Sequence, residues 1–355
     1  MLAETQLDLF QLPENNKSEE EKEKKKVNPP PPLRGFVGIG IGGDDQVVYQ
    51  IELPEAHQMR CVGSTGNWLI TVDKSRMIHL LNPFTRAQID LPSQSTFETG
   101  FDDDGVGLTP EYHRDCLLKK VIISSTPSSS KDWIVMAIYH YHRKLAIARP
   151  GDVSWTTLET PLDYVIDIIF FKNQFYTVNC RGILMVCDIG DDVHSSKACV
   201  LTERLPKKTV QENMYLVELL GELLLVIKFV LDLDDREDED NEEIKLPAYK
   251  TEKFEIYKLD FANKKWKEVN SLGEYCLFLG FNTSVSVRAV SGFLKKNCIY
   301  FTDDFTLGYR GNRIPGGSDM GVFDLEDKSI QPHYRGESTC YYSPPIWLIP
   351  TSLEK

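Results

Sequence analysis

The stretch MRCVGSTGNWLITVDKSRMIHLLNPFTRAQIDLP, residues 59–92, decides the fold. It holds four short runs rich in β-branched and apolar residues, and turn-forming or polar residues separate them. The runs are MRCVGS (59–64), WLITVD (68–73), MIHLLNP (77–83) and AQIDLP (87–92). Four short strands joined by tight turns are the composition of one blade of a β-propeller, so we expect a four-stranded sheet here.

The same four-run cycle recurs four more times along the chain, without long helical periodicity. The later cycles begin at Lys119, Tyr164, Met214 and Ser284. Two terminal runs, VVYQIELP (47–54) and CYYSPPIWLIP (340–350), lie outside the five cycles. A ring of sheets has no free edge only when its ends join, so we expect these runs to build a composite sixth blade. The predicted fold is all-β, a β-propeller of about six four-stranded blades over residues 46–355, with five or seven blades as alternatives.

Residues 1–33 are predicted to form a disordered, charged and proline-rich tail ahead of the propeller. They have few aromatic residues, a Lys/Glu-rich run over 17–26 and four consecutive prolines at 29–32. The acidic residues in this region argue against an organellar transit peptide, and no basic segment precedes an apolar core as it does in a signal peptide. We therefore expect a cytoplasmic or nuclear protein, or one present in both compartments.

Three glycines, Gly38, Gly40 and Gly43, spell a G-x-G-x-x-G pattern. This pattern binds the pyrophosphate of a dinucleotide when a strand precedes the glycines and a helix follows them. Here prolines precede the glycines and the strand-like run 47–54 follows them. We therefore interpret the glycines as a loop that leads into the propeller, and we expect no cofactor.

Composition and charge exclude several classes of function. The chain has 355 residues, of which 41% are hydrophobic, and a net charge of −13. Asp232–Glu243 alone carries −8, and no basic stripe is present, so we expect no nucleic-acid partner. The longest apolar run, 214–231, is interrupted by charged residues, so we expect two buried strands and no membrane partner. The eight cysteines show no C-x-x-C spacing, and we expect them to be reduced.

Residues 53–92 resemble the start of the KIB-type β-propeller domain of land-plant F-box proteins. In that family a Gly-Ser pair precedes a G-W-L strand, and an L-N-P-x-T-x-x-x-I-x-L-P hairpin follows. The matching residues here are Gly63, Ser64, Trp68, Leu69, Asn82, Pro83, Thr85, Ile89, Leu91 and Pro92. Asn67 stands where the family usually has glycine. The likeness continues in family order from about residue 46 to the C-terminus, and it implies a structural role for the matching residues.

The resemblance implies a non-catalytic domain that selects a protein partner, a ubiquitination substrate, for a cullin-based ubiquitin ligase. Members of the family commonly carry an N-terminal F-box, a helical module that docks on an Skp-type adaptor. Residues 1–45 show no such leucine-rich helical pattern, so binding of an adaptor is left open. The alternative is an F-box-less propeller that binds and regulates a protein partner without any ligase. A third interpretation, an enzyme with a site in the propeller channel, has no supporting constellation of residues.

Tests for catalytic or metal chemistry give no candidate. His140 and His142 are two residues apart in a predicted strand and would face one side, but the sequence locates no further ligands. The acidic run has Arg236 where an EF-hand loop has a fifth-position ligand, so calcium coordination is not expected. The adjacent carboxylates Asp303 and Asp304 would point apart in a strand, and we interpret them as turn residues.

Two connections are long, the acidic insert 232–247 in the fourth cycle and the segment 305–320 in the fifth. Both join the second and third strands of their cycle, so they should leave the ring on the same face and from neighbouring blades. The second connection carries Tyr309, Arg310 and Arg313, and tyrosine and arginine are frequent residues of binding hot spots. We predict that these three residues bind a protein partner, because propellers bind with loops held on a rigid ring.

Overall fold

The computed structural model describes residues 7–11, 36–40, 47–51, 53–56, 59–98, 117–127, 132–190, 195–205, 213–232, 249–289, 294–304, 319–331 and 346–348. β-strands dominate these residues. Two short 3-10 turns, η1 (Pro54–Ala56) and η2 (Gln94–Thr96), lie among them. In this part of the chain no helix has the length and apolar character needed to cross a membrane.

The described strands form six sheets. We call five of them blades 1 to 5, in chain order from β4, and the sixth the closing sheet. Blades 1 to 4 have four strands each. Blade 1 contains β4 (Arg60–Thr65), β5 (Trp68–Val72), β6 (Ile78–Leu81) and β7 (Gln88–Leu91). Blade 2 contains β8 (Leu118–Ile123), β9 (Val135–Tyr139), β10 (Lys144–Ala148) and β11 (Thr156–Leu158). Blade 3 contains β12 (Val165–Phe171), β13 (Gln174–Asn179), β14 (Leu184–Asp188) and β15 (Lys197–Val200). Blade 4 contains β16 (Met214–Leu219), β17 (Glu222–Asp232), β18 (Tyr249–Asp260) and β19 (Lys265–Val269).

Two further sheets complete the set. Blade 5 has five strands in the order β21 (Val285–Arg288), β20 (Tyr275–Leu279), β22 (Cys298–Phe301), β23 (Gly321–Asp324) and β24 (Ile330–Gln331). The closing sheet has the order β25 (Ile346–Leu348), β1 (Leu7–Gln11), β2 (Phe36–Gly40) and β3 (Val47–Ile51). The strands at the two ends of the chain therefore share one sheet, as the ring argument predicts.

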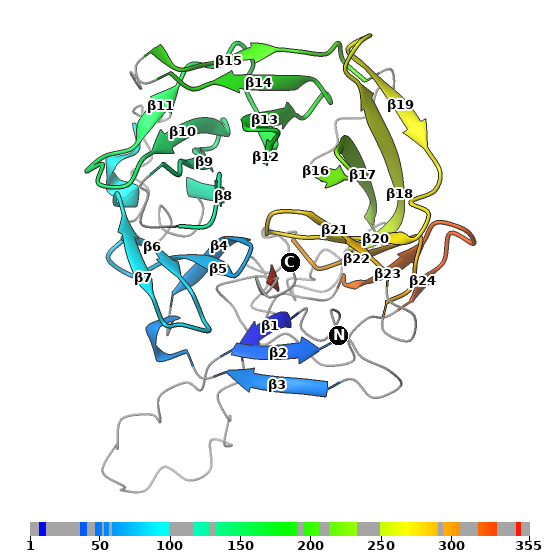
Figure 1. Ribbon diagram of the computed structural model, residues 1–355, viewed down its shortest axis with the longest axis horizontal. Helices are drawn as coiled ribbons and strands as arrows, with labels where there is room; N and C mark the ends of the chain where they lie inside the picture. Colours follow the sequence, from blue (N-terminus) through cyan, green and yellow to red (C-terminus); the bar gives the residue numbers. More distant parts are fainter. Residues whose placement is uncertain are drawn as a thin grey trace, which may run out of the picture.

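Figure 1 shows the sheets arranged around a ring in chain order, with the first strand of blades 1 to 4 innermost and the last strand outermost. Innermost strands of neighbouring sheets contact each other, in the pairs β25 with β4, β4 with β8, β8 with β12, β12 with β16 and β16 with β21. The chain is therefore an all-β propeller. The predicted number of four-stranded blades is wrong, because the structure has five four-stranded sheets rather than six, and blade 5 has five strands.

The sequence cycle misplaces the first strand of blade 5. It assigns SVSVRAV (284–290) to that position, whereas the structure inserts β20 between β21 and β22. β20 pairs parallel to β22, with Leu277 opposite Ile299, and both side chains are fully buried. β21 is only partly buried and lies at the inner edge of the sheet. The strand that the cycle omits is therefore the more deeply buried of the two.

The N-terminal predictions also need correction. Leu7–Gln11, inside the predicted disordered tail, forms β1 and pairs antiparallel with β2 and β25, while the rest of residues 1–33 lies outside the described part of the chain. Gly38 and Gly40, interpreted as loop residues, belong to β2, which pairs antiparallel with β1 and β3. Gly43 lies outside the described residues. A strand in an antiparallel sheet lacks the following helix that a dinucleotide-binding glycine pattern requires.

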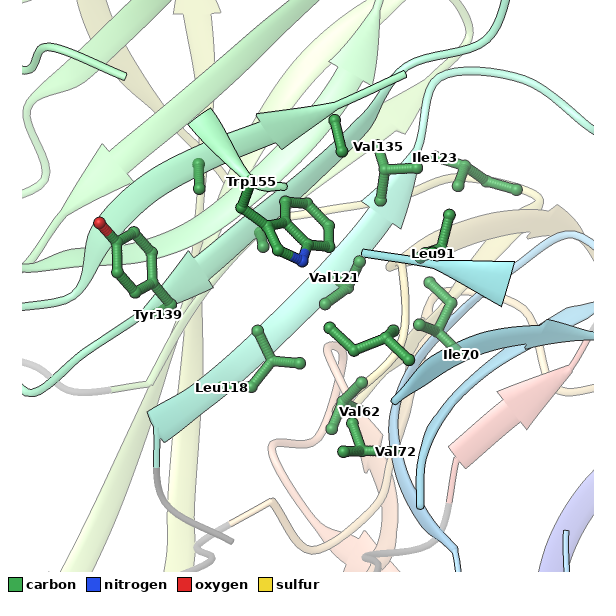
Figure 2. Close-up of a cluster of buried hydrophobic side chains, with 14 of the residues drawn as sticks. Val62, Ile70, Val72, Leu91, Leu118, Val121, Ile123, Val135, Tyr139 and Trp155 are labelled. Atoms are coloured by element: carbon green, nitrogen blue, oxygen red, sulfur yellow. The ribbon is translucent and has the colours of Figure 1, made fainter. Parts of the chain in front are cut away.

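Apolar side chains fill the space between neighbouring blades. Figure 2 shows the cluster between blades 1 and 2, where Ile70 and Leu91 of blade 1 lie near Val121 of blade 2. Trp155 packs into this cluster and stacks on Phe97, with 4.8 Å between the ring centroids. Since each buried aromatic removes a large apolar area from water, such inter-blade clusters supply most of the stabilisation of the ring.

Three consecutive innermost strands carry a β-bulge at corresponding places. The register shifts between Cys61 and Gly63 in β4, between Leu118 and Lys120 in β8, and between Val165 and Asp167 in β12. A bulge re-aims the residue that follows it. In each strand that residue, Gly63, Lys120 or Asp167, makes a contact with the next blade.

The contacts differ in chemistry but each joins two blades. A Cβ at Gly63 would lie 2.4 Å from the carbonyl oxygen of Val121, so only glycine fits this approach of β4 to β8. Lys120 forms a buried ion pair with Asp167, which also accepts a hydrogen bond from the backbone N–H of Leu216 at 2.7 Å. Burial raises the pKa of Asp167, although the charge of Lys120 opposes this shift. Blades 1 to 4 are therefore linked in sequence near the centre of the ring.

Candidate functional site

The three predicted partner-binding residues, Tyr309, Arg310 and Arg313, lie outside the described residues, as does 233–248 of the acidic insert. The structure does describe the ends of both long connections. The first connection leaves β17 at Asp232 and returns as β18 at Tyr249, and these two residues pair with each other. The second follows Asp304 in blade 5 and returns at Asp319, just ahead of β23. The polar side chains at these ends form the candidate site.

We call these side chains the loop base and define it by seven residues from blades 4 and 5. They are Tyr215, Lys228, Tyr249, Thr251, Asp303, Asp304 and Asp319. Tyr215 comes from β16, Lys228 from β17, and Tyr249 and Thr251 from β18. The three aspartates come from blade 5, on either side of the second connection. The loop base therefore joins the residues at which the two long connections begin and end, which we call the roots of the connections.

Lys228 is the charged centre of the loop base. Its side chain is 1% exposed, in an otherwise apolar stretch of β17. The Nζ atom lies 3.0 Å from Asp319 Oδ2 and 3.5 Å from Asp304 Oδ1. It also lies 5.2 Å from the ring centroid of Phe301, which adds a cation–π contact. A lysine is almost never buried this deeply without partners, and blade 5 provides them.

Asp303 and Asp304 belong to this network and are not turn residues as predicted. Asp303 is fully buried and accepts a hydrogen bond from the Tyr249 hydroxyl at 2.6 Å. Asp304 accepts one from the Tyr215 hydroxyl, also at 2.6 Å. The two adjacent carboxylates thus have different partners, which agrees with the expectation that neighbouring side chains of an extended segment point apart.

Asp319 fastens the start of β18 to blade 5. Its carboxylate accepts hydrogen bonds from the backbone N–H of Thr251 at 2.9 Å and from the Thr251 hydroxyl at 2.7 Å. Its own backbone N–H donates to Asp303 Oδ2 at 3.2 Å. The two long connections therefore leave the ring side by side, as the strand cycle predicts, from roots that are held together by buried hydrogen bonds.

The electrostatics of the loop base favour fixed protonation states. Burial alone would lower the pKa of Lys228, but the carboxylates of Asp304, Asp319 and Asp303 outweigh burial and raise it. Burial, followed by the charge of Asp304, raises the pKa of Tyr215 well above its usual value. Lys228 therefore stays an ammonium and Tyr215 a phenol donor at neutral pH. Groups with such fixed states suit a structural role better than proton transfer.

The structure also places the other residues considered for chemistry. His140 and His142 lie in the turn between β9 and β10 rather than in a strand, and their rings stack at 5.3 Å between centroids. Among the described residues, no group of three or more His, Cys, Asp or Glu side chains could hold a metal ion. The six cysteines within this part of the chain are free, and four of them are buried. Burial raises the pKa of Cys187 and Cys276 to about 12, so both are thiols at neutral pH.

The residues of the family motif hold blade 1 in the ring. The Ser64 hydroxyl donates to the carbonyl oxygen of Trp347 at 2.6 Å and so joins blade 1 to the closing sheet. The Pro92 carbonyl oxygen accepts a hydrogen bond from Trp155 Nε1 at 2.9 Å, which joins blade 1 to blade 2. Asn82 stabilises the hairpin turn that contains Pro83 and Thr85, because its Oδ1 accepts a hydrogen bond from the backbone N–H of Thr85 at 3.0 Å. Of the remaining motif residues, Trp68, Leu69 and Leu91 are buried, and Ile89 is partly buried and packs on the cluster between blades 1 and 2.

These features define a β-propeller in which buried hydrogen bonds hold together the ends of two long connections, one in blade 4 and one in blade 5. The family model described as the KIB1-4 beta-propeller matches residues 39–324. The chain therefore belongs to the KIB1-4 β-propeller family, as the motif residues predict.

Relatives from Arabidopsis thaliana carry F-box names. A putative F-box protein is 29% identical over 299 residues, which cover 82% of this chain and 77% of that protein. The F-box/kelch-repeat protein KIB1 is 27% identical over 273 residues, which cover 74% of this chain and 60% of KIB1. The chain thus spans less than two thirds of the length of KIB1. A putative 6-phosphogluconolactonase from Bacteroides uniformis, of solved structure, has a TM-score of 0.31 at 12% identity, covering 66% of this chain and 63% of that one.

Proposed function

We propose that this chain is a non-catalytic protein-interaction domain related to the substrate-recognition part of plant F-box proteins in cullin-based ubiquitin ligases. Its membership of the KIB1-4 β-propeller family and the F-box names of its relatives support this proposal. In this role the partner is a protein that becomes a ubiquitination substrate, and other subunits of the ligase perform the chemistry. The proposal includes action in the cytoplasm, the nucleus or both, without a cofactor.

The observation that carries the proposal is the loop base. Buried hydrogen bonds from Tyr249 to Asp303 and from Thr251 to Asp319 hold the roots of both long connections together. Binding residues are commonly placed on loops that a rigid scaffold positions, because ordering the loop then costs less on binding. We assign partner binding to the second connection, through Tyr309, Arg310 and Arg313.

The assignment is tested with two triple variants that remove the same kinds of side chain. Tyr309→Ala/Arg310→Ala/Arg313→Ala changes the proposed surface. Phe261→Ala/Lys264→Ala/Lys265→Ala changes the β18–β19 hairpin, at the end of β18 away from its root at Tyr249. Cross-linking of the tagged chain in plant cells should identify partners with the wild type and the hairpin variant, and lose them with the first variant. Retention of the same partners by both variants would refute the assignment.

A second candidate function is an F-box-less propeller that binds and regulates its partner without a ligase. One observation favours it: Leu7–Gln11 and Phe36–Gly40 are strands of the closing sheet, so these two segments belong to the propeller and not to a helical F-box. Binding of the purified chain to an Skp-type adaptor separates the two functions. A KIB-type protein that carries an F-box is the positive control. Adaptor binding supports the ligase role, and its absence beside a working control supports the regulator.

A further inference from the structure

The β20–β21 hairpin joins blade 5 directly to blade 1, although the closing sheet lies between these two blades in the ring (Figure 1). Its turn is formed by residues 280–284, in which the backbone N–H of Thr283 donates to the carbonyl oxygen of Ser64 at 3.0 Å. The hydroxyls of Thr283 and Thr65 are hydrogen-bonded at 3.0 Å. Phe281 packs on the apolar cluster shared by blade 1 and β25. We call this turn the latch, because it ties the last blade to the first.

The latch and blade 1 also hold β25, through Trp347. The backbone N–H of Trp347 donates to Asn282 Oδ1 at 3.2 Å, and its carbonyl oxygen accepts from the Ser64 hydroxyl at 2.6 Å. The indole Nε1 donates to the carbonyl oxygen of Leu279 at 3.0 Å. The buried Trp347 ring lies edge-on to Phe278, with 4.8 Å between the ring centroids. These bonds fix β25 to blades 5 and 1 without using β1.

The attachment of β1 to β25 is short. The two strands pair over three residues, with Asp8 opposite Trp347. The backbone groups of Trp347 bond to Asn282 and Ser64, so the Asp8–Trp347 pair is the kind that exchanges no backbone bonds in an antiparallel ladder. The two flanking positions of the register are then the ones that exchange bonds. A terminal strand attached in this way is among the first segments to open locally.

From these two sets of contacts we propose that β1 is a releasable strap, which leaves β25 while the latch keeps the ring closed. Release of β1 breaks its pairing with β25, whereas opening the ring requires loss of the latch bonds and of the Trp347 contacts as well. The fold thus contains a conformational device in which the N-terminal strand detaches without disturbing the blades that carry the loop base. This inference goes beyond the proposed function, because it depends neither on the long connections nor on a ligase.

The first test is native-state hydrogen exchange, followed by mass spectrometry, on the full chain and on Leu9→Pro. Proline at this position removes a backbone N–H from a strand that lies between β25 and β2, so it disrupts the pairing of β1. We expect amide exchange in β4 (60–65) and in β20 (275–279) to stay within about twofold of the wild type, since local opening of one segment leaves the rest protected. In the wild type, 7–11 should exchange faster than β4. Faster exchange in β4 and β20 with Leu9→Pro, or an unfolded variant, shows that the ring needs β1 and overturns the proposal.

The second test asks whether the latch is the closure that remains after release. Thr283→Val removes the hydroxyl that bonds to Thr65 and keeps the shape of the side chain. In the Leu9→Pro background we expect it to speed exchange in β4 about fivefold, which corresponds to one hydrogen bond of about 1 kcal/mol. In the wild-type background the change should be below about twofold, because the closing sheet also holds the junction.

Thr157→Val is the matched control for the second test. It removes a hydroxyl that is hydrogen-bonded at 2.7 Å to the Tyr139 hydroxyl within blade 2, so its effect should be the same in both backgrounds. If Thr283→Val also has the same effect in both backgrounds, the latch does not replace β1 as the closure of the ring, and the proposal is refuted.

Discussion

Replacing Lys228 by methionine should strongly destabilise the propeller. Methionine has a similar length but no charge, and the substitution leaves the carboxylates of Asp304 and Asp319 without the ammonium that lies 3.5 and 3.0 Å from them. Removing one partner of a buried ion pair costs about 3 to 5 kcal/mol, because the remaining charge stays desolvated. This is a large share of the roughly 5 to 15 kcal/mol that stabilises a typical fold.

Equilibrium unfolding in urea measures the loss, with Lys265→Met as the matched control. Lys265 lies exposed on β19, so its replacement should change the free energy of unfolding by less than about 0.5 kcal/mol. Adding Asp319→Asn to Lys228→Met should restore part of the loss, because the two residues are coupled. A loss below about 1 kcal/mol for Lys228→Met, the range of a surface pair, would refute the argument that the loop base is a buried charge network.

The pH dependence of the loss follows from the pKa of Lys228. Its pKa is raised in the folded protein relative to its usual value. The stabilisation from this group is therefore complete below the unfolded-state pKa and is lost as the pH rises through the folded-state pKa. Because lysine titrates near pH 10.4, the deficit of the variant should be constant between about pH 6 and 9 and should decrease only above that range. A deficit that vanishes within this range would contradict the assignment.

Three further predictions concern the ring and its cysteines. Gly63→Ala should lower the free energy of unfolding by about 1 to 3 kcal/mol, since the new Cβ meets the Val121 carbonyl oxygen at 2.4 Å; an unchanged urea midpoint would show that β4 and β8 can separate. Ser64→Ala should cost about 0.5 to 1.5 kcal/mol in the same assay, because it removes the hydrogen bond from the Ser64 hydroxyl to the Trp347 carbonyl oxygen of β25. Iodoacetamide at about pH 8 should label the exposed Cys199 well before Cys276, whose pKa of about 12 keeps it a thiol, as mass spectrometry can measure.

The sequence predicts the blades well where the signal is local. Runs of apolar residues separated by turn residues give the strands of blades 1 to 4, because hairpin pairing joins segments that are near each other in the chain. The prediction of strands from sequence fails for β1 and β2, which are short segments flanked by polar, proline-rich or glycine-rich sequence. β1 pairs with β25, more than three hundred residues away, so no local pattern identifies its partner. The parallel pairing of β20 with β22 is missed for a related reason, because β21 intervenes in the chain.

The loop base was not predicted, although each half of it left a signal. Lys228 stands in an apolar run, and at the level of sequence its charge serves only to exclude a membrane-spanning helix. Asp303 and Asp304 follow the buried strand β22, where a burial argument would ask for partners. Buried charges require partners, so a lone lysine in one strand and a carboxylate pair after another should have suggested a contact. The step that sequence alone does not provide is the closeness of β17 and blade 5 at that end of the ring.

The arrangement of the loop base separates stability from recognition. The polar contacts that hold the roots of the long connections come from strands of the ring or from residues adjoining them, such as Thr251 and Asp319. The donors and acceptors of these bonds all lie outside 233–248 and 305–318, so substitutions within those two ranges do not remove any of them. A scaffold of this kind allows the binding specificity to vary while the positions of the two connections stay fixed relative to each other. For this physical reason, partner-binding residues are to be sought in the connections themselves, and stabilising residues in the loop base.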